Sequence, residues 1–440
     1  MTKNGNDQTP RFAPRNPKRH GSEHPIHINW FPYYAGYNSG FVFDSLKSLA
    51  IEMGDSILDP WNGSGTTTTT AYRMGATTIG CDINPVMVIA AKSALLDPGT
   101  APSLLPLSEE LLNVARTLSL ELKNDPLSEW YSPSSAYHIR RIHHAIWKVL
   151  VESDSMPTCR ADHISGLSTL AAFFITALFR VTRSFLSPFL GSNPTWIRSP
   201  KTPQNRVRPS EQIVFHRFQK EIQAMSLRLS DAFNRGLKKP IHGSGPTITV
   251  APSQSLPVKN SSIKAVVTSP PYLTRIDYAV ATKPELATLE MSLSKDFAKL
   301  RKSMLGAPAI RAASPPPQAY GESCERFMQA VANHPSKGSI NYYHKLFRQY
   351  FSDMHKSLGE ISRVLVTNGN CVLVVQDSYY KEIHADLAQF VTDIADIHGL
   401  TLMGRNDFEW NRNMVRVNSR SRRYRTSDIA VESALWFSKL

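Results

Sequence analysis

The stretch Ile57-Leu-Asp-Pro-Trp-Asn-Gly-Ser-Gly-Thr-Thr67 decides the fold that we expect for this chain. It begins as a short apolar strand, enters a tight loop with two glycines, and continues into a Thr/Ala-rich helix that ends at Gly75. The next segment, Thr77 to Asp82, is typical of a second strand and has an acidic residue at its carboxyl end. A strand, a glycine loop, a helix, a strand and an acid in this order form the nucleotide-binding unit of doubly wound α/β sheets. The stretch therefore predicts an α/β fold with a nucleotide-like ligand at this loop and the acid on its ribose hydroxyls.

The spacing of the glycines separates this loop from the dinucleotide-binding type. Gly63 and Gly65 are followed by Thr68, where the G-x-G-x-x-G fingerprint has its third glycine. The dipeptide Asp59-Pro60 precedes the loop and also argues against NAD. We therefore expect a nucleotide-containing cofactor of another kind.

A second stretch, Lys264-Ala-Val-Val-Thr-Ser-Pro-Pro-Tyr272, predicts where a substrate is held. Residues 265–268 are typical of a buried strand, which must stop at Ser269 because neither following proline can donate a ladder hydrogen bond. The Ser269 hydroxyl and the Pro270 carbonyl can both accept hydrogen bonds from an NH₂ group, and the Tyr272 ring can stack on a planar base. A strand that simply ends in a diproline turn is the structural alternative.

Three motifs together resemble the S-adenosylmethionine-dependent amino-methyltransferases of DNA. They are Asp59-Pro-x-x-Gly-Ser-Gly-Thr-Thr67, Gly80-x-Asp-x-Asn-Pro85 and Thr268-Ser-Pro-Pro-Tyr272. In that family the Ser-Pro-Pro-Tyr form is typical of N4-cytosine enzymes, whereas Asp- or Asn-Pro-Pro-Tyr marks N6-adenine enzymes. The resemblance covers roughly residues 24–98 and 246–440, and it implies a Rossmann-like class I methyltransferase sheet in an α/β fold.

The resemblance also implies a cofactor, site residues and a reaction. S-adenosyl-L-methionine would bind at Asp59, Pro60, Asn62, Gly63, Ser64, Gly65, Thr66, Asp82 and Ile83. The catalytic residues would be Ser269, Pro270, Pro271 and Tyr272, with no metal ion. The implied reaction moves a methyl group to the N4 amine of cytosine at a specific site in double-stranded DNA, after the base is flipped out of the duplex. Such enzymes belong to restriction–modification or related defence, so the implied partners are DNA and, in that setting, a separate cognate restriction endonuclease.

One segment departs from the family pattern. Family members usually carry an acidic residue after the third strand, where it contacts the cofactor adenine. Here that strand is expected at Thr247 to Val250, and Ala251-Pro-Ser-Gln254 follows it. Ser253 or Gln254 could supply a neutral hydrogen bond in place of the acid.

Charge and cysteine usage restrict the function classes. The formal net charge of +14 over 440 residues favours a polyanionic partner such as DNA. The four cysteines show no C-x-x-C spacing, so neither a zinc site nor a disulfide framework is indicated. No Pro-Cys dipeptide occurs, which removes the usual nucleophile context of C5-cytosine methyltransferases. The N-terminus is polar, and the longest apolar run, Leu170 to Phe179, is too short to span a bilayer, so we expect a cytoplasmic protein without membrane association.

The chain divides into a tail, a discontinuous catalytic domain and an insertion. Residues 1–22 are polar and basic, and we expect a disordered tail. Residues 23–98 and 246–440 should form the catalytic domain. Residues 99–245 contain no convincing strand and should form a large helical insertion, with helices at Leu107–Leu122, Ser134–Glu152, Leu167–Phe185 and Glu211–Arg235. Its place between the cofactor and catalytic motifs makes it the candidate target-recognition region; a helical subdomain that packs on the core without touching DNA is the alternative.

The C-terminal part should complete the sheet. We expect a long helix from Tyr342 to Val366, a strand at Cys371–Gln376, and a helix from Ile383 to His398. Leu400–Met403 and Ile429–Phe437 would form a closing strand pair. The loop between them is rich in arginine and is a candidate phosphate contact, the named residues being Arg412, Arg416, Arg420, Arg422 and Arg423, with Arg405 and Arg425 nearby. A solvated charged loop is the alternative.

Other functions stay open from the sequence. N6-adenine methylation of DNA is the nearest alternative, because the two exocyclic amines are chemically alike. Methylation of an RNA base amine would predict a dedicated RNA-binding domain, and no such signature is visible. A DNA-binding protein with a vestigial methyltransferase fold is disfavoured by the intact glycine loop, Asp82 and Ser269-Pro-Pro-Tyr272.

Overall fold

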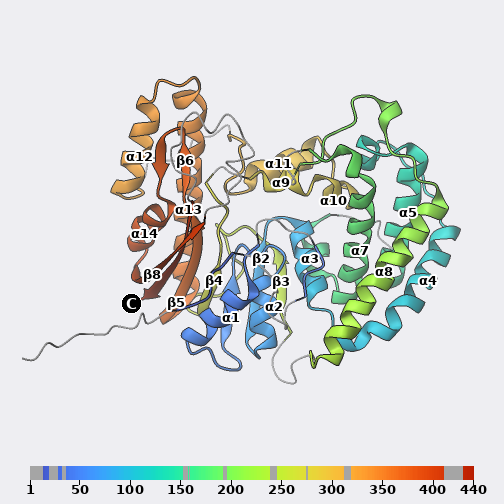
Figure 1. Cartoon of the computed structure of the whole chain (residues 1–440), viewed down its shortest axis with the longest axis horizontal. Coiled ribbons are helices and arrows are strands. Elements are labelled where there is room, and N and C mark those ends of the chain that lie inside the picture. The colour runs from blue at the N-terminus through green and yellow to red at the C-terminus, as the bar shows by residue number, and fades with distance from the viewer. Residues whose placement is uncertain are drawn as a thin grey trace, which may run out of the picture.

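A seven-stranded, mostly parallel sheet organises the molecule (Figure 1). The structure is a computed structural model that describes residues 13–18, 28–31, 36–151, 157, 159–191, 196–237, 245–273, 276–311, 319–410 and 430–440. In spatial order the strands are β3 (Thr247–Val250), β2 (Thr77–Asp82), β1 (Ser56–Asp59), β4 (Ile263–Thr268), β5 (Leu365–Gln376), β9 (Ala430–Lys439) and β8 (Leu400–Trp410). The first five are parallel, and β9 runs antiparallel to both β5 and β8. This is the Rossmann-like α/β architecture expected from the sequence.

The strand order places a switch point at the centre of the sheet. Strand β1 pairs with β2 on one side and with β4 on the other. From β1 the chain extends the sheet outward through β2 and β3, and then returns across β1 to add β4 and β5. In open α/β sheets, ligands bind outside the carboxyl ends of the strands at such a point.

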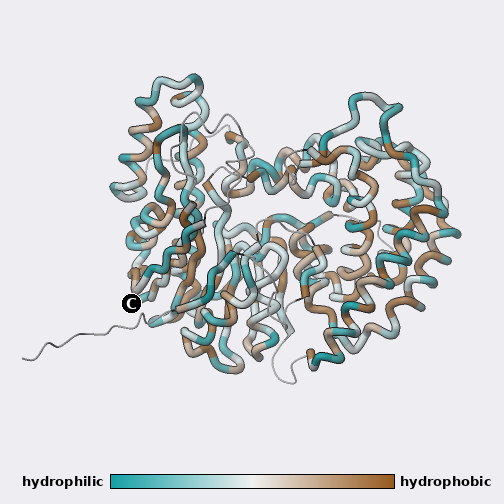
Figure 2. Tube along the Cα trace, in the orientation of Figure 1, coloured by the Kyte–Doolittle hydropathy of each residue, from teal (hydrophilic) through white to brown (hydrophobic). Residues whose placement is uncertain are grey.

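Alternate strand residues pack on opposite faces of the sheet. Val266, Leu373 and Val375 contact one core, which contains the helices α12 (Glu322–Asn333), α13 (Lys345–Val364) and α14 (Leu387–Ile397). Ala265, Val267, Val372 and Val374 contact the other core, which contains α1 (Ser39–Ser48) and α2 (Thr66–Arg73). Because successive strand side chains point to opposite faces, the near-continuous apolar runs of β4 and β5 suit central strands covered on both sides. Figure 2 shows hydrophobic residues following these central strands.

The described part of the insertion between β2 and β3 consists of helices and connecting loops, and its only β-type pairings are two isolated bridges. It follows α3 (Pro85–Ala94), and its α-helices are α4 (Ala101–Thr117), α5 (Pro133–Leu150), α6 (Ala161–Gly166), α7 (Thr169–Phe185) and α8 (Glu211–Asn234). Helix α7 is buried along most of its length and packs against α3, which joins the insertion to the sheet domain. The composition of α7 explains this placement, since the residues from Ala171 to Phe179 are too apolar to face water.

A second group of helices follows the catalytic strand. These are α9 (Tyr278–Ala281), α10 (Lys283–Thr288) and α11 (Lys295–Ser303), and Figure 1 shows α9 and α11 above β2 and β3. Short 3₁₀ turns occur at Pro98–Thr100, Pro126–Glu129, Ser187–Phe189 and Pro203–Asn205. In the described part of the chain, no helix is long and apolar enough to cross a membrane.

Three sequence expectations differ from the structure. The expected helix from Tyr342 begins as a π-helical turn at Ser339–His344 before α13, and β5 starts at Leu365. The expected helix from Ile383 is instead a hairpin, β6 (Ser378–Tyr380) with β7 (Ile383–Ala385), followed by the shorter α14. Lys381 makes the hairpin turn possible with φ of 55°, a conformation that apolar periodicity alone does not reveal.

Part of the expected disordered tail is also ordered. Arg15 pairs with Asp44 of α1 at 2.7 Å, and the Asn38 N–H donates to the Pro17 carbonyl at 2.6 Å. Residues 13–18 therefore lie against α1, because the Asp44 carboxylate pairs with Arg15. The polar, basic composition of the tail does not reveal this ion pair. The rest of residues 1–22 lies outside the described residues.

Candidate active site

A cavity lies at the carboxyl ends of β1, β2 and β4, and both predicted motifs line it. The space between its lining residues is about 840 Å³, which includes open solvent at its mouth. The predicted residues in its walls are Pro60, Asn62, Gly63, Ser64, Thr66, Asp82, Ile83, Ser269, Pro270, Pro271 and Tyr272. The fold thus brings together two sequence segments separated by the whole helical insertion.

Asp82 is held in one orientation at the end of β2. Its carboxylate accepts hydrogen bonds from the backbone N–H of Gly63 at 2.9 Å and of Asn84 at 2.8 Å. Burial raises the pKa of Asp82 to about 6, although both hydrogen bonds oppose the shift. The side chain therefore ties the glycine loop to β2 and keeps an acceptor at the cavity wall, as contact with ribose hydroxyls requires.

The glycine loop leaves polar groups without partners. The Trp61 indole nitrogen, the Asn62 amide nitrogen and the Ser64 hydroxyl are buried and have no hydrogen-bond partner within the described structure, and all three residues line the cavity. Buried donors in this state are costly unless a ligand or solvent satisfies them. They fit a cofactor that presents several acceptor groups to the loop, such as the carboxylate and hydroxyl oxygens of S-adenosylmethionine.

Gly65 has a different role from the one expected for it. It does not line the cavity; it adopts φ of 85° at the start of α2, and an added Cβ would lie 2.9 Å from the Ala91 Cβ of α3. Gly80 is similarly constrained, because an added Cβ would lie 2.6 Å from the Asn62 side chain. These glycines permit the close packing of α2, α3 and the loop, and they shape the cavity from behind.

Asp59 also lies behind the cavity and does not line it. Its buried carboxylate accepts hydrogen bonds from the Thr268 hydroxyl and from the Trp61 backbone N–H at 3.1 Å. The Tyr37 hydroxyl lies within 3.4 Å of it and also contacts Thr67. Burial raises the pKa of Asp59 to about 6. Asp59 therefore links the end of β1 to the end of β4, through its hydrogen bond with Thr268.

Hydrogen bonds fix Ser269, Pro271 and Tyr272 of the Ser-Pro-Pro-Tyr motif. The Ser269 hydroxyl donates to the Val374 carbonyl at 2.9 Å, which leaves its oxygen lone pairs available to accept. The Tyr350 hydroxyl donates to the Pro271 carbonyl at 2.8 Å. The Tyr272 hydroxyl donates to Glu432 at 3.0 Å, so the ring that is expected to stack on a base is tethered at its far end.

The residues after α11 also line the cavity. Met304 and Leu305 line it, and Gly306, with φ of 77°, packs so closely that an added Cβ would lie 2.9 Å from the Tyr272 carbonyl oxygen. An ion pair of 2.6 Å between Arg301 and the buried Asp277 holds this segment in place. The cavity therefore combines polar groups of the glycine loop with apolar side chains such as Met304 and Leu305, a lining that suits a planar aromatic base.

The segment that departs from the family pattern also lines the cavity, at Pro252, Ser253 and Gln254. The Ser253 hydroxyl lies 2.8 Å from the Ser357 hydroxyl, so part of its hydrogen-bonding capacity is used inside the protein. Contact of these residues with the cofactor adenine stays a prediction.

The sequence analysis did not predict several residues that line the cavity, and its predicted DNA contacts stay predictions. The unpredicted lining residues are Gly36, Tyr37, Trp61, Asn84, Met87, Tyr278, Ser303, Met304 and Leu305. The aromatic run before α1 was the one available signal for Tyr37. The predicted DNA contacts Arg412, Arg416, Arg420, Arg422 and Arg423, and also Arg425, lie outside the described residues, so their role stays a prediction. Arg405 belongs to β8 rather than to the loop and pairs with Asp407 at 2.7 Å.

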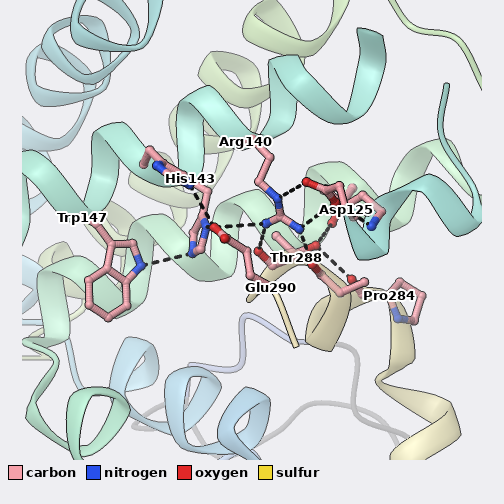
Figure 3. A network of polar contacts seen from close by, with 11 residues as sticks. Asp125, Arg140, His143, Trp147, Pro284, Thr288 and Glu290 are labelled. Atoms are coloured by element: carbon pink, nitrogen blue, oxygen red, sulfur yellow. Dashed lines mark hydrogen bonds and ion pairs between the residues drawn. The ribbon is translucent and has the colours of Figure 1, made fainter. Parts of the chain in front are cut away.

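A second polar cluster joins α5 of the insertion to the segment after α10, and none of its ligand residues lines the cavity (Figure 3). The ligand atoms of His143, His144 and Glu290 lie within 4.8 Å of one another, a spacing that a metal ion could use. However, the Trp147 indole N–H donates to Nε2 of His143 at 3.1 Å, so Nδ1 carries the proton and donates to Glu290 at 3.1 Å. A metal on Nδ1 would move that proton to Nε2, where it would face the indole donor. Burial lowers the pKa of His143 to about 4, which agrees with a neutral ring in a structural network.

The same network joins the insertion to the helices above the cavity. Arg140 of α5 is fully buried; it pairs with Asp125 and donates to the backbone carbonyls of Ala287 and Thr288 at the end of α10. Glu290 follows with φ of 63°, directly after this helix. The insertion therefore supports the segment that leads to α11 and to the cavity-lining residues after it.

Comparisons with known proteins find similar sequences for the segment that contains the glycine loop. Residues 44–93 match the family model described as DNA methylase. A stretch of 62 residues is 44% identical to the Type II methyltransferase M.BsoBI of Geobacillus stearothermophilus. That match covers 14% of this chain and 12% of the relative, so it concerns a small part of either protein.

Comparison with solved structures finds methyltransferases at low similarity. A geranyl diphosphate methyltransferase in complex with GPP and sinefungin is 8% identical, with a TM-score of 0.31 over 91% of this chain and 76% of that chain. A putative sarcosine dimethylglycine methyltransferase from Galdieria sulphuraria is 8% identical, with a TM-score of 0.30 over 91% of this chain and 84% of that chain. These scores are low, so the architecture given above rests on the strand order and register of this chain itself.

Proposed function

We propose that this chain is an S-adenosylmethionine-dependent methyltransferase of DNA that acts on the N4 amine of cytosine at a specific site in duplex DNA. One observation carries the proposal: a single cavity is lined by the glycine loop with Asp82 and by Ser269-Pro-Pro-Tyr272. The match of residues 44–93 to DNA methylases supports the cofactor half. The basic composition supports a polyanionic substrate.

The cofactor, when bound, supplies a methyl group already activated on a sulfonium. The task of the protein is then to position the acceptor amine, whose lone pair is delocalised into the base. The Ser269 oxygen and the Pro270 carbonyl can accept hydrogen bonds from the two amine N–H groups, which localises the lone pair on nitrogen and directs it across the cavity. The Ser269 proton is engaged by the Val374 carbonyl, so the hydroxyl faces the amine as an acceptor.

The remaining residues orient the base and exclude water. Tyr272 offers a ring for stacking, and its hydrogen bond to Glu432 keeps the ring from rotating away. Met304 and Leu305 add apolar side chains to the cavity lining. An amine inside a duplex is out of reach of such a cavity, so the target base must leave the stack, which costs a few kcal/mol. Stacking on Tyr272 would offset roughly 1–3 kcal/mol of that cost.

N6-adenine methylation is the second candidate. The same acceptors would serve an adenine amine, and Ser269 favours cytosine only through the family's residue preference. A restriction–modification setting, a separate endonuclease and a cytoplasmic location follow from the resemblance and stay predictions.

A methyl-transfer assay tests the proposed activity. The purified chain is incubated with methyl-labelled S-adenosylmethionine and, in parallel, with mixed-sequence duplex DNA, the same DNA as single strands, or transfer RNA. We expect label in duplex DNA that survives ribonuclease treatment. Label in transfer RNA alone, or in no nucleic acid, would contradict the proposal.

A further inference from the structure

We propose that the lysine-bearing face of α11 contacts the phosphate backbone of duplex DNA beside the target base. This inference rests on the proposed function, and it assigns a DNA-contacting surface within the described residues. Three lysines define the face: Lys295, Lys299 and Lys302, at positions i, i+4 and i+7 of the helix. Residues with this spacing share one side of a helix, and all three side chains are exposed.

The opposite side of α11 is fixed to the protein. Phe297 is buried, and Leu300 packs against the same hydrophobic core. Arg301 pairs with the buried Asp277, which also caps α9 by accepting from the Val280 N–H at 3.2 Å. The lysine face therefore has a defined orientation on the molecule and does not belong to a free loop.

Its position relative to the cavity is equally defined. Ser303, Met304 and Leu305 follow Lys302 directly in the chain and line the cavity. Beyond them, Arg311 pairs with the buried Asp353 and its N–H donates to Gln349 at 3.0 Å, which anchors the far end of the segment. A duplex whose flipped base enters the cavity would bring its neighbouring phosphates past this helix.

The stability of the helix accounts for Lys302, which stands in the last turn where the helix dipole favours a cation, but not for Lys295 and Lys299. Lys295 stands in the first turn, where the helix dipole disfavours a cation, and like charges four residues apart repel. Within the described residues, no carboxylate forms an ion pair with any of the three, although the exposed Asp296 lies three residues before Lys299. A polyanion would relieve this repulsion, and duplex DNA carries one charge per roughly 1.7 Å of axis.

The test compares two triple variants by salt-dependent DNA binding. The first replaces Lys295, Lys299 and Lys302 by glutamine. The control replaces Lys47, Lys259 and Lys356, which are equally exposed but lie on other elements, so both proteins lose the same net charge. Binding of a labelled mixed-sequence duplex is measured by anisotropy from about 50 to 200 mM salt, and cofactor-product binding by calorimetry verifies that each variant is folded.

The α11 variant should bind at least about tenfold more weakly at roughly 100 mM salt, and its log K against log salt slope should fall by about 2–3 units, since each phosphate contact contributes about 0.9. Methyl transfer at saturating DNA should be unchanged, and the control variant should match the wild type. Wild-type affinity and slope in the α11 variant would overturn the inference while leaving the proposed function intact. A loss on structured RNA but not on duplex DNA would overturn the choice of partner. A wild-type protein that binds no duplex would refute the proposed function and the inference together.

Discussion

Replacing Ser269 by alanine tests the acceptor that the structure places at the start of the catalytic motif. The change removes one hydroxyl and leaves Pro270, Pro271 and Tyr272 in place. The backbone should keep its conformation, because Tyr350 holds the Pro271 carbonyl and Glu432 holds the Tyr272 hydroxyl independently of Ser269.

Two magnitudes separate a structural loss from a catalytic one. The hydrogen bond from Ser269 to the Val374 carbonyl is a neutral pair, and its removal should lower the free energy of unfolding by about 0.5–1.5 kcal/mol. The acceptor matters most as the amine gains positive charge in the transition state, where loss of one preorganised group typically costs on the order of 10²–10³ in rate. The rate should therefore fall far more than the stability.

Single-turnover methyl transfer on a matched duplex measures the rate, and calorimetry and anisotropy measure cofactor and DNA binding. We expect both affinities to persist in Ser269→Ala while the single-turnover rate falls. Ser303→Ala is a matched control, because it also removes a cavity-lining hydroxyl that donates to one backbone carbonyl. Ser269→Asp restores an acceptor, and we expect a poor cytosine enzyme rather than an adenine enzyme, since cavity shape also selects the base. Full activity in Ser269→Ala would show that the amine sits elsewhere.

Four further changes probe the supporting structure. Asp82→Asn should weaken cofactor binding by about 1.5–3 kcal/mol, as measured by calorimetry. Because the pKa of Asp82 is raised to about 6, the affinity of the wild type should also fall as pH drops through that value, and the variant should lack this pH dependence. Gly65→Ala should lower the unfolding free energy by about 1–3 kcal/mol, and by less in an Ala91→Gly background; an equal loss in both would exclude the α3 contact. Tyr272→Leu should weaken duplex binding by roughly 1–3 kcal/mol, whereas Tyr272→Phe keeps the ring and should bind normally. Arg140→Met should destabilise the protein by about 3–5 kcal/mol in urea unfolding, since it leaves a buried carboxylate unpaired; a neutral result would remove the structural role of the network.

Local sequence patterns were sufficient for the sheet and for most of the cavity. Hydrophobic runs and glycine signals located β1, β2, β4 and the core of β5, because parallel strands that are buried on both faces consist of nearly continuous apolar residues. Four of the five insertion helices followed from apolar periodicity, with the ends of α4 shifted by five or six residues, whereas the short α6 was not predicted. The two motifs meet at the cavity because both follow strands that end at the same edge of the sheet.

The remaining features depend on contacts between distant segments. Gly65 looked like a ligand contact, but only the packed position of Ala91 shows that the glycine accommodates a helix. Asp59 looked like a cofactor residue, and only the meeting of β1 with β4 shows its bond to Thr268. The β6–β7 hairpin was hidden because its strands are three residues each, too short for a period-two pattern.

The apolar lining that follows α11 was also invisible in the sequence. Met304 and Leu305 lie in a Lys-rich segment that has no strand or helix signal of its own. Their position depends on the Arg301–Asp277 ion pair and on the fit of Gly306 over the Tyr272 carbonyl. Such contacts join residues about 24 to 34 positions apart, so no local periodicity reports them.

The most direct test of the central claim is the identity of the modified base. Plasmid DNA methylated by the purified chain is digested to nucleosides and analysed by mass spectrometry, with the Ser269→Ala protein as a control. The account predicts N4-methylcytosine from the wild type and a strongly reduced amount from the variant. N6-methyladenine would select the second candidate, and DNA without any methylated amine would contradict the assignment of this cavity as an amino-methyltransferase site.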